Sequence, residues 1–195
     1  MISAQDVKKL REQTGAAMMD AKHALEEAGG DIEKAIESLR KKGQKMAAKR
    51  AGREAKEGCV AAYIHANGQV GAMVELVSET DFVARNEQFK ELAYDIAMHV
   101  AATDPQYLSS DDVPEEVIKK EKEVYREQLA KEGKPESMME NIMKGKLKKF
   151  YTDVCLLDQS FIKDEEKTVA EVITEAIGRM GEKIEIRRFA RFALK

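Results

Sequence analysis

The sequence contains no tryptophan and has only two cysteines and three histidines among its 195 residues. No two of these cysteines and histidines lie at the spacing of a metal-binding motif, so the sequence indicates no metal site and no cofactor. The cysteines, Cys59 and Cys155, are expected to be reduced residues of the core. A disulfide that joins two chains of a dimer is the alternative.

Long apolar runs are also missing. No stretch approaches the roughly 18–20 apolar residues that a membrane-spanning helix needs. The amino-terminal residues, MISAQDVKKLREQTG, are amphipathic from the start and contain no signal-peptide core. We therefore expect no contact with a membrane and a cytoplasmic location, while a matured organellar protein would have the same features.

The sequence lacks the motifs of common catalytic and nucleotide-binding sites. It has no GxxxxGK[ST] phosphate loop and no GxGxxG fingerprint. It also has no GxSxG elbow, HExxH motif or Cys–His signature. The many carboxylates lie in segments such as SDDVPEE and KDEEK, where acids suit helix starts and turns. These absences favour a protein that recognises a partner, with no catalytic residue and no nucleotide bound directly.

The charge balance argues against a further class of protein. Thirty-three basic and 36 acidic residues give a net charge of −3, which argues against a dedicated nucleic-acid binder. With 43% hydrophobic and 35% charged residues, the composition is that of a soluble globular protein. Aromatic residues are few, and abundant Ala, Glu, Lys and Met favour helices.

Residues 1–42 are predicted to form three short helices. Ser3 and Asp6 make a capping-box pattern ahead of the first helix. A glycine pair at 29–30 can end the second helix in the left-handed conformation, and Asp31 can cap the third. A bundle of this size has a small core and usually binds a partner.

Residues 43–57, GQKMAAKRAGREAKE, form a basic, alanine-rich stretch. Such a stretch can be an arm that contacts RNA or a solvated helical linker. The linker is favoured, because no aromatic residue is interleaved to stack on bases.

The clearest β-strand pattern covers residues 58–77. Two β-rich segments flank Asn67-Gly68, a pair that predicts a tight hairpin because both positions tolerate positive φ. A helical pattern follows, and its apolar stripe should pack on the hairpin. The stripe consists of Phe89, Leu92, Ala93, Ile96, Ala97 and Val100. The carboxyl-terminal segment IEIRRFARFALK is predicted to be a third strand of the same sheet.

A helical hairpin is predicted at about 114–149. Its first helix starts near Pro114 and runs to about Lys131, and its second runs from about Glu136 to Phe150. The short loop between them implies antiparallel packing. Because the apolar stripe is narrow and the charge high, the hairpin can project as an arm. The predicted fold is therefore α+β: a three-helix bundle, then a core, 58–195, with a small antiparallel sheet packed on helices.

The segment ELVSETDFVARNEQF, residues 75–89, places Asp81 and Phe82 where the predicted strand gives way to a helix. Phe82 lies seven residues before Phe89, near the same face of a continuous helix. The residues alone therefore favour packing of Phe82 in the core. The alternative is a side chain aimed at a partner.

Two stretches together closely resemble the elongation factor Ts family. They are LREQTGAAMMDAKHALEEAGGDIEKAIESLRKKG, residues 10–43, and ETDFVARNEQF, residues 79–89. In the carboxyl half, GKLKKFYTDVCLLDQSFIKDEEKTV is similar to the corresponding segment of the family, so the resemblance covers nearly the whole chain. Two positions depart from the family: Val77 stands where asparagine is common, and Ala21 where cysteine is often found. The recognition residues after both are intact.

The resemblance implies an architecture. The first segment would be the ubiquitin-associated-like (UBA-like) module of the family, and the helical hairpin would be its coiled-coil arm. Longer members contain two copies of the core subdomain, whereas this sequence has one hairpin-plus-helix unit. The chain thus resembles the short form of the family, which implies a homodimer.

The resemblance also implies a function and a site. Members of the family are translation elongation factors: they bind elongation factor Tu carrying GDP and promote GDP release by disturbing its phosphate and magnesium site, which allows GTP to bind. Phe82 would act as a wedge, Asp81 would hydrogen-bond or repel at the same place, and Val83 would support the contact. The residues implied to touch the partner are Thr80, Asp81, Phe82 and Val83 in one stretch and Arg11, Met18, Met19 and Lys22 in the other.

The residues of the second group also have plainer interpretations. Arg11 and Lys22 are ordinary solvated charges apart from the resemblance. Met18 and Met19 could be buried in the bundle, but adjacent helix residues point about 100° apart, so at least one should be exposed. Two other functions stay open: a passive adaptor or chaperone that binds a protein partner without nucleotide exchange, and an RNA-binding protein that uses residues 43–57.

Overall fold

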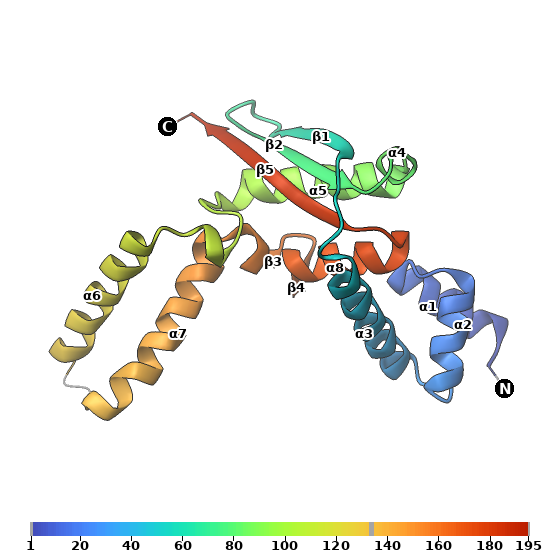
Figure 1. Cartoon of the computed structure of the whole chain (residues 1–195), viewed down its shortest axis with the longest axis horizontal. Helices are drawn as coiled ribbons and strands as arrows, with labels where there is room; N and C mark the ends of the chain where they lie inside the picture. Colours follow the sequence, from blue (N-terminus) through green and yellow to red (C-terminus); the bar gives the residue numbers. More distant parts are fainter. Residues whose placement is uncertain (1, 133–134, 195) are drawn as a thin grey trace. The chain divides into compact units, whose positions relative to one another are not determined.

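The computed structural model describes residues 2–132 and 135–194 (Figure 1). The chain divides into two compact units. The first contains the described residues up to Ala61, Val74–Tyr94 and Glu171–Arg187, and the second contains Ala62–Met73, Asp95–Ala170 and the described residues from Arg188. The regular secondary structure of the described residues consists of helices and two small β-sheets, so the α+β prediction is confirmed at this level.

The first unit begins with three helices that pack on one another, as predicted. They are α1 (Ala4–Thr14), α2 (Met18–Glu27) and α3 (Ile32–Arg50). Ser3 and Asp6 form the expected capping box. The Asp31 side chain accepts a hydrogen bond from the Lys34 N–H at 3.1 Å. The small core of the bundle consists of Leu10, Ala16, Ala21, Ala24, Leu25 and Ala35.

Helix α3 continues past residue 42 through the first half of the predicted basic linker. In this part it packs on α8 (Val169–Met180): a Cβ on Gly43 would lie 3.2 Å from the carbonyl oxygen of Thr174. Arg40 pairs with Glu171 of the same helix at 2.6 Å. Residues 43–50 are therefore helical, and α3 is held against α8 within the first unit.

The main sheet has three strands in the order β1-β2-β5: β1 (Glu57–Ile64), β2 (Val70–Ser78) and β5 (Ile184–Ala193). The predicted turn closes with a hydrogen bond from the His65 N–H to the Val70 carbonyl at 2.8 Å, and Gly68 has a φ of 68°. The predicted hairpin and the third strand are thus confirmed.

The helix that follows the hairpin is α5 (Glu87–Thr103). All six residues of the predicted apolar stripe are buried in it. In the second unit the Arg191 side chain of β5 donates to the carbonyl oxygen of Ala101 at 2.9 Å, which holds the end of α5 against this strand.

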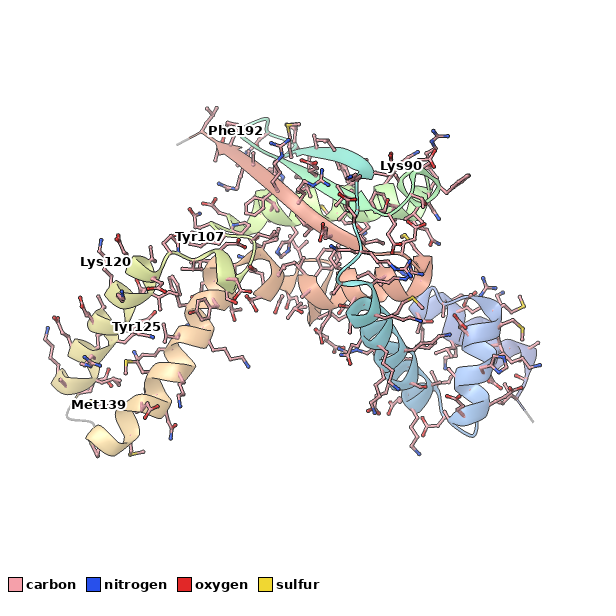
Figure 2. The ribbon with its side chains drawn as sticks, viewed as in Figure 1. Lys90, Tyr107, Lys120, Tyr125, Met139 and Phe192 are labelled. Atoms are coloured by element: carbon pink, nitrogen blue, oxygen red, sulfur yellow. The ribbon has the colours of Figure 1, made fainter. Side chains whose placement is uncertain are left out.

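The predicted helical hairpin consists of α6 (Glu115–Lys131) and α7 (Glu136–Val154), which pack side by side in the second unit (Figure 1). The Lys146 Nζ donates to Gln128 Oε1 at 3.2 Å and lies 5.3 Å from the ring centre of Tyr125. Figure 2 labels Tyr125 on α6. Helix α7 extends four residues beyond the predicted end at Phe150.

The remaining elements were not predicted from the sequence. They are the 3₁₀ turns η1 (Ser110–Asp112) and η2 (Leu156–Asp158), the antiparallel pair β3 (Ser160–Phe161) and β4 (Asp164–Thr168), and helix α8. Both cysteines are free. Cys155 is fully buried, and burial, with the charges of Asp158 and Asp112, raises the pKa of its thiol to about 11. Cys59 is half-buried.

Candidate partner-binding site

Phe82 lies on a separate short helix, α4 (Asp81–Ala84), between β2 and α5. The chain leaves helical geometry after it, and the Asn86 side chain accepts a hydrogen bond from the Gln88 N–H at 2.9 Å where α5 begins. Phe89 is fully buried, whereas Phe82 is 83% exposed. The prediction from residue spacing that Phe82 packs in the core is therefore wrong, because it assumed one continuous helix.

The other residues of α4 leave the aromatic ring uncovered. Asp81 pairs with Arg85 at 3.0 Å, one helical turn away; the Arg85 side chain is exposed and that of Asp81 is half-buried. Val83 is half-buried beside them. Burying a phenylalanine side chain contributes about 1.5–3 kcal/mol, which this fold does not gain at Phe82. The exposed ring is thus available to a partner.

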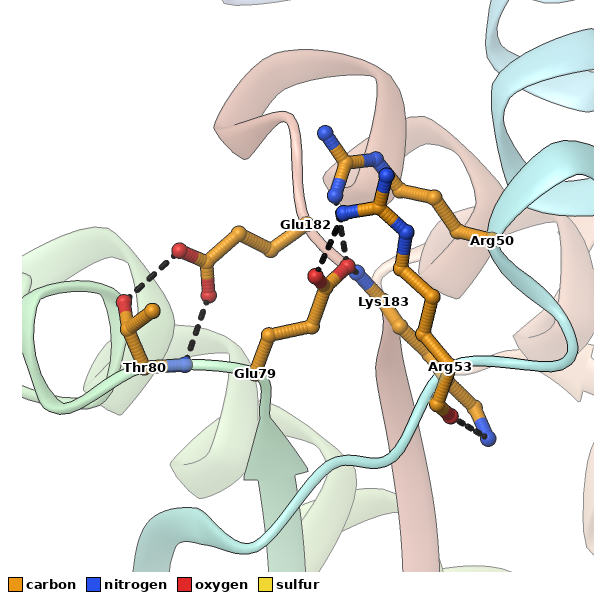
Figure 3. A network of polar contacts seen from close by, with 6 residues as sticks. All are labelled: Arg50, Arg53, Glu79, Thr80, Glu182 and Lys183. Atoms are coloured by element: carbon orange, nitrogen blue, oxygen red, sulfur yellow. Dashed lines mark hydrogen bonds and ion pairs between the residues drawn. The ribbon is translucent and has the colours of Figure 1, made fainter.

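Thr80 precedes α4 and connects it to a distant segment. It occupies the N-cap position, but its side chain makes no capping hydrogen bond. Instead its hydroxyl donates to Glu182 Oε1 at 2.7 Å and its backbone N–H donates to Glu182 Oε2 at 3.0 Å (Figure 3). Ser78 donates to the Thr80 carbonyl oxygen at 3.0 Å. All the polar groups of Thr80 therefore have partners.

Glu79 is bound in a network of its own (Figure 3). Its carboxylate accepts hydrogen bonds from Arg50 at 2.6 Å, from Arg53 at 2.8 Å and from the Lys183 N–H at 2.7 Å. Burial would raise the pKa of this side chain, which is only 15% exposed. The hydrogen bonds outweigh burial and lower the pKa of Glu79 to about 2.

This shifted pKa predicts a pH-dependent contribution to stability. Because the folded-state pKa of Glu79 lies below the ordinary value of 4.5, the contribution is complete above about pH 4.5 and is lost as the pH falls toward 2. Glu79→Gln should lower the free energy of unfolding at pH 7 by about 1.5–3 kcal/mol, as expected for hydrogen bonds to a charged group. Urea unfolding of both proteins from pH 7 to pH 3 measures this. The stability difference should shrink with acidification, and a difference that does not depend on pH would contradict the assignment.

The second predicted group lies on α1 and α2. Met18 and Met19 occupy the first turn of α2 and are 60% and 57% exposed, so the prediction that at least one is exposed is confirmed. The Arg11 side chain donates to the carbonyl oxygen of Ala16 at 3.2 Å, which ties α1 to the turn before the methionines. Lys22 pairs with Glu26 at 3.8 Å on an exposed face.

Both groups belong to the first unit, and each is contacted by a residue at or just after the end of α8. The Arg179 side chain lies against Gly15, in the turn before α2: a Cβ there would be 2.9 Å from Arg179 Cδ. Glu182 binds Thr80 ahead of α4. Neither Arg179, in the last turn of α8, nor Glu182, two residues after its end, was predicted from the sequence. A spacing of Val169, Ile173, Ala176 and Ile177, followed by Gly181, was the available signal.

The described residues contain no group of three or more His, Cys, Asp or Glu side chains placed to hold a metal ion. Among the described helices, none is long and apolar enough to cross a membrane. What the site offers is an exposed aromatic side chain on a tethered turn and an exposed methionine pair on a small bundle. Such features suit binding to a protein surface.

Comparisons with known proteins show which sequences the chain resembles. The family model described as "Elongation factor TS" matches residues 3–177. The chain is 57% identical to a protein named Elongation factor Ts from Moorella thermoacetica, over 98% of this chain and 95% of that protein. A protein of the same name from Syntrophomonas wolfei is 57% identical over 98% of this chain and 90% of its own length. One from Thermosipho melanesiensis is 57% identical over 100% of this chain and 99% of its own.

Proposed function

The chain belongs to the elongation factor Ts family, and on this premise we propose that it is a translation elongation factor that binds elongation factor Tu carrying GDP and promotes GDP release. It does so by disturbing the phosphate and magnesium site of the GTPase, after which GTP can bind. The observation that carries the proposal is the exposed ring of Phe82 on a turn tethered through Thr80 and Glu182.

In this mechanism Phe82 enters elongation factor Tu as a wedge. Its neighbours contribute a carboxylate, Asp81, that hydrogen-bonds or repels beside the phosphate site, and an apolar side chain, Val83, that supports the contact. Thr80 fixes the start of the helix that presents them. No catalytic residue is needed, because exchange requires only binding that differs between two states of the GTPase.

Thermodynamic linkage sets the size of the effect. A protein that binds the nucleotide-free GTPase more tightly must weaken nucleotide binding by the same factor. Weakening it about 1,000-fold takes roughly 4 kcal/mol of differential contact. One buried aromatic side chain supplies about 1.5–3 kcal/mol. Phe82 is therefore insufficient alone, and the surface with Met18 and Met19 must contribute.

That second surface is the UBA-like module, residues 1–42, which contacts the GTP-binding domain of elongation factor Tu through Arg11, Met18, Met19 and Lys22. Residues 43–57 form the basic linker, whose first half is the carboxyl-terminal part of α3. The core, residues 58–195, carries the remaining contacts, with the helical hairpin at about 114–149 as its coiled-coil arm. The protein acts in the cytoplasm without a cofactor.

The protein works as a homodimer, as expected for a short member of the family. Support comes from exposed apolar residues on the part of the β1-β2-β5 sheet that belongs to the second unit. Ile64 is 67% exposed and lies over Gly71, and Met73 is exposed on the next strand. Phe192 and Leu194 are exposed at the end of β5 (Figure 2). A second chain would cover such a surface.

A single substitution tests the dimer. Ile64→Asp should shift the mass measured by sedimentation equilibrium at micromolar concentration from two chains to one, because it places a charge in an apolar interface. The matched control is Val124→Asp, a change at another exposed apolar residue, on α6, which should leave the mass unchanged. A native protein with the mass of one chain would contradict the homodimer.

The exchange activity itself is tested by stopped-flow release of a fluorescent GDP analogue from elongation factor Tu. Acceleration by the protein supports the proposal. Stable association without faster release would identify a passive adaptor instead. Salt-dependent binding of RNA would point to the basic stretch as the functional element.

A further inference from the structure

We infer that Glu182 is a positioning residue that fixes the start of α4 and so aims Phe82 at the partner. The inference rests on the proposed exchange function and adds to it a residue from outside the two predicted contact groups. Glu182 lies between α8 and β5 and acts through Thr80.

Helix α4 cannot hold its own orientation. It has four residues, whereas isolated helices need about 12–15 residues to persist in water, because nucleation is costly. Its largest apolar side chain, Phe82, is exposed and adds little packing within the chain. Its N-cap residue, Thr80, does not cap it through the side chain. Contacts from outside the helix must therefore set its direction.

The Glu182 carboxylate supplies those contacts. Its two oxygens accept from two different groups of Thr80, the hydroxyl at 2.7 Å and the backbone N–H at 3.0 Å. Two hydrogen bonds from one planar carboxylate fix both the position and the rotation of a residue, and bonds to a charged acceptor are stronger than neutral ones. The Thr80 carbonyl oxygen accepts from the Ala84 N–H at 3.2 Å, so this placement passes directly into α4.

Glu182 is itself held by a reciprocal contact. The next residue, Lys183, donates its N–H to Glu79 Oε1 at 2.7 Å, and Glu79 immediately precedes Thr80. The segment before α4 and the segment after α8 are therefore joined in both directions. Glu79 accepts one hydrogen bond from the second segment, and Glu182 accepts two from Thr80 in the first (Figure 3). Arg50 and Arg53 fix Glu79 from the end of α3. These contacts hold the backbone next to Glu182 close to the start of α4.

Exchange kinetics test the inference. Glu182→Ala should lower the rate constant for protein-stimulated GDP release about tenfold, which corresponds to about 1.4 kcal/mol. In a Phe82→Ala background the same change should cause no further loss, because a residue that acts through Phe82 has nothing left to position. Glu182→Gln should recover much of the rate, since its amide oxygen still accepts from the Thr80 N–H.

The matched control is Glu171→Ala. Glu171 is a carboxylate on α8 that pairs with Arg40 at 2.6 Å in the same unit but lies far along the helix from Glu182. This variant should stimulate GDP release like the native protein. Thermal unfolding of all variants, followed by circular dichroism, verifies that each is folded.

A second measurement does not depend on elongation factor Tu. The chain has no tryptophan, so Phe82→Trp introduces a single indole on α4. Glu182→Ala in this background should increase the amplitude of nanosecond motion in the fluorescence anisotropy decay, whereas Glu171→Ala should not. A native-like decay in the Glu182→Ala protein would overturn the inference.

The outcomes separate the inference from the proposed function. If the Phe82→Ala protein stimulates GDP release slowly and the Glu182→Ala protein stimulates it at the native rate, the proposed function stands and the positioning role of Glu182 is refuted. The positioning role is also refuted if the two changes lower the rate of GDP release additively in the Phe82→Ala, Glu182→Ala double variant. Additive losses would mean that the two residues contribute independently. If the unaltered protein does not stimulate GDP release, the proposed function fails and the inference fails with it.

Discussion

Phe82→Ala should reduce the stimulation of GDP release from elongation factor Tu by about 10- to 100-fold, the equivalent of the 1.5–3 kcal/mol that a buried phenylalanine contributes. The effect should be on the maximal rate more than on the concentration needed for half-maximal stimulation. In the proposed mechanism the Phe82 side chain makes its contacts only as the nucleotide leaves, so removing the side chain removes contacts specific to that step. Stopped-flow release across a range of protein concentrations separates the two quantities.

The folded chain itself should be unaffected by Phe82→Ala. The side chain is 83% exposed, so its removal leaves no cavity, and the urea midpoint should match that of the native protein. Ile162→Ala is the matched control, an exposed apolar side chain outside both predicted contact groups, and it should stimulate release normally. An unchanged maximal rate in the Phe82→Ala protein would remove the wedge from the mechanism.

The combined change Met18→Ala and Met19→Ala should weaken productive association with elongation factor Tu by about 10- to 30-fold. Each methionine is more than half exposed and loses on the order of 1 kcal/mol of apolar contact with the partner when truncated. These contacts form on binding and persist through exchange, so the concentration for half-maximal stimulation should rise while the maximal rate changes less.

A methionine elsewhere on the surface controls for nonspecific effects. Met138, on α7, is exposed to a similar degree, and Met138→Ala should leave both kinetic quantities unchanged. If the double methionine variant has a native half-maximal concentration, the amino-terminal bundle does not contact the GTPase through this turn.

Local patterns predicted much of the fold. The Asn-Gly turn specified the hairpin, and the apolar stripe from Phe89 to Val100 specified the buried face of α5. Pro114 lies at the N-cap of α6, as its fixed φ and missing N–H favour. Each of these signals acts within a few residues, which is why it can be read from the sequence.

Residue spacing alone could not predict whether Phe82 is buried, because it does not show whether the helix is continuous. Phe82 and Phe89 share a face only if one helix connects them, and the chain departs from helical geometry at Asn86. Asparagine competes with the helix by bonding to nearby backbone groups, as it does here with the Gln88 N–H. That residue type was a usable signal for the break.

The contacts that support α4 were beyond local patterns. Thr80 and Glu182 are 102 residues apart, and Glu79 and Lys183 are 104 apart. Their meeting depends on β5 pairing with β2 and on α8, which was not predicted. Composition and periodicity identify a strand and a helix, but they do not specify which residues lie side by side at the ends of neighbouring elements.

The proposed release of GDP from elongation factor Tu is tested most directly by titrating the native protein into elongation factor Tu loaded with a fluorescent GDP analogue. We expect release to accelerate with protein concentration and to reach a maximum. The protein should also bind more weakly when GDP is present in excess, as linkage requires. Release at the spontaneous rate at every protein concentration would contradict the proposed exchange function.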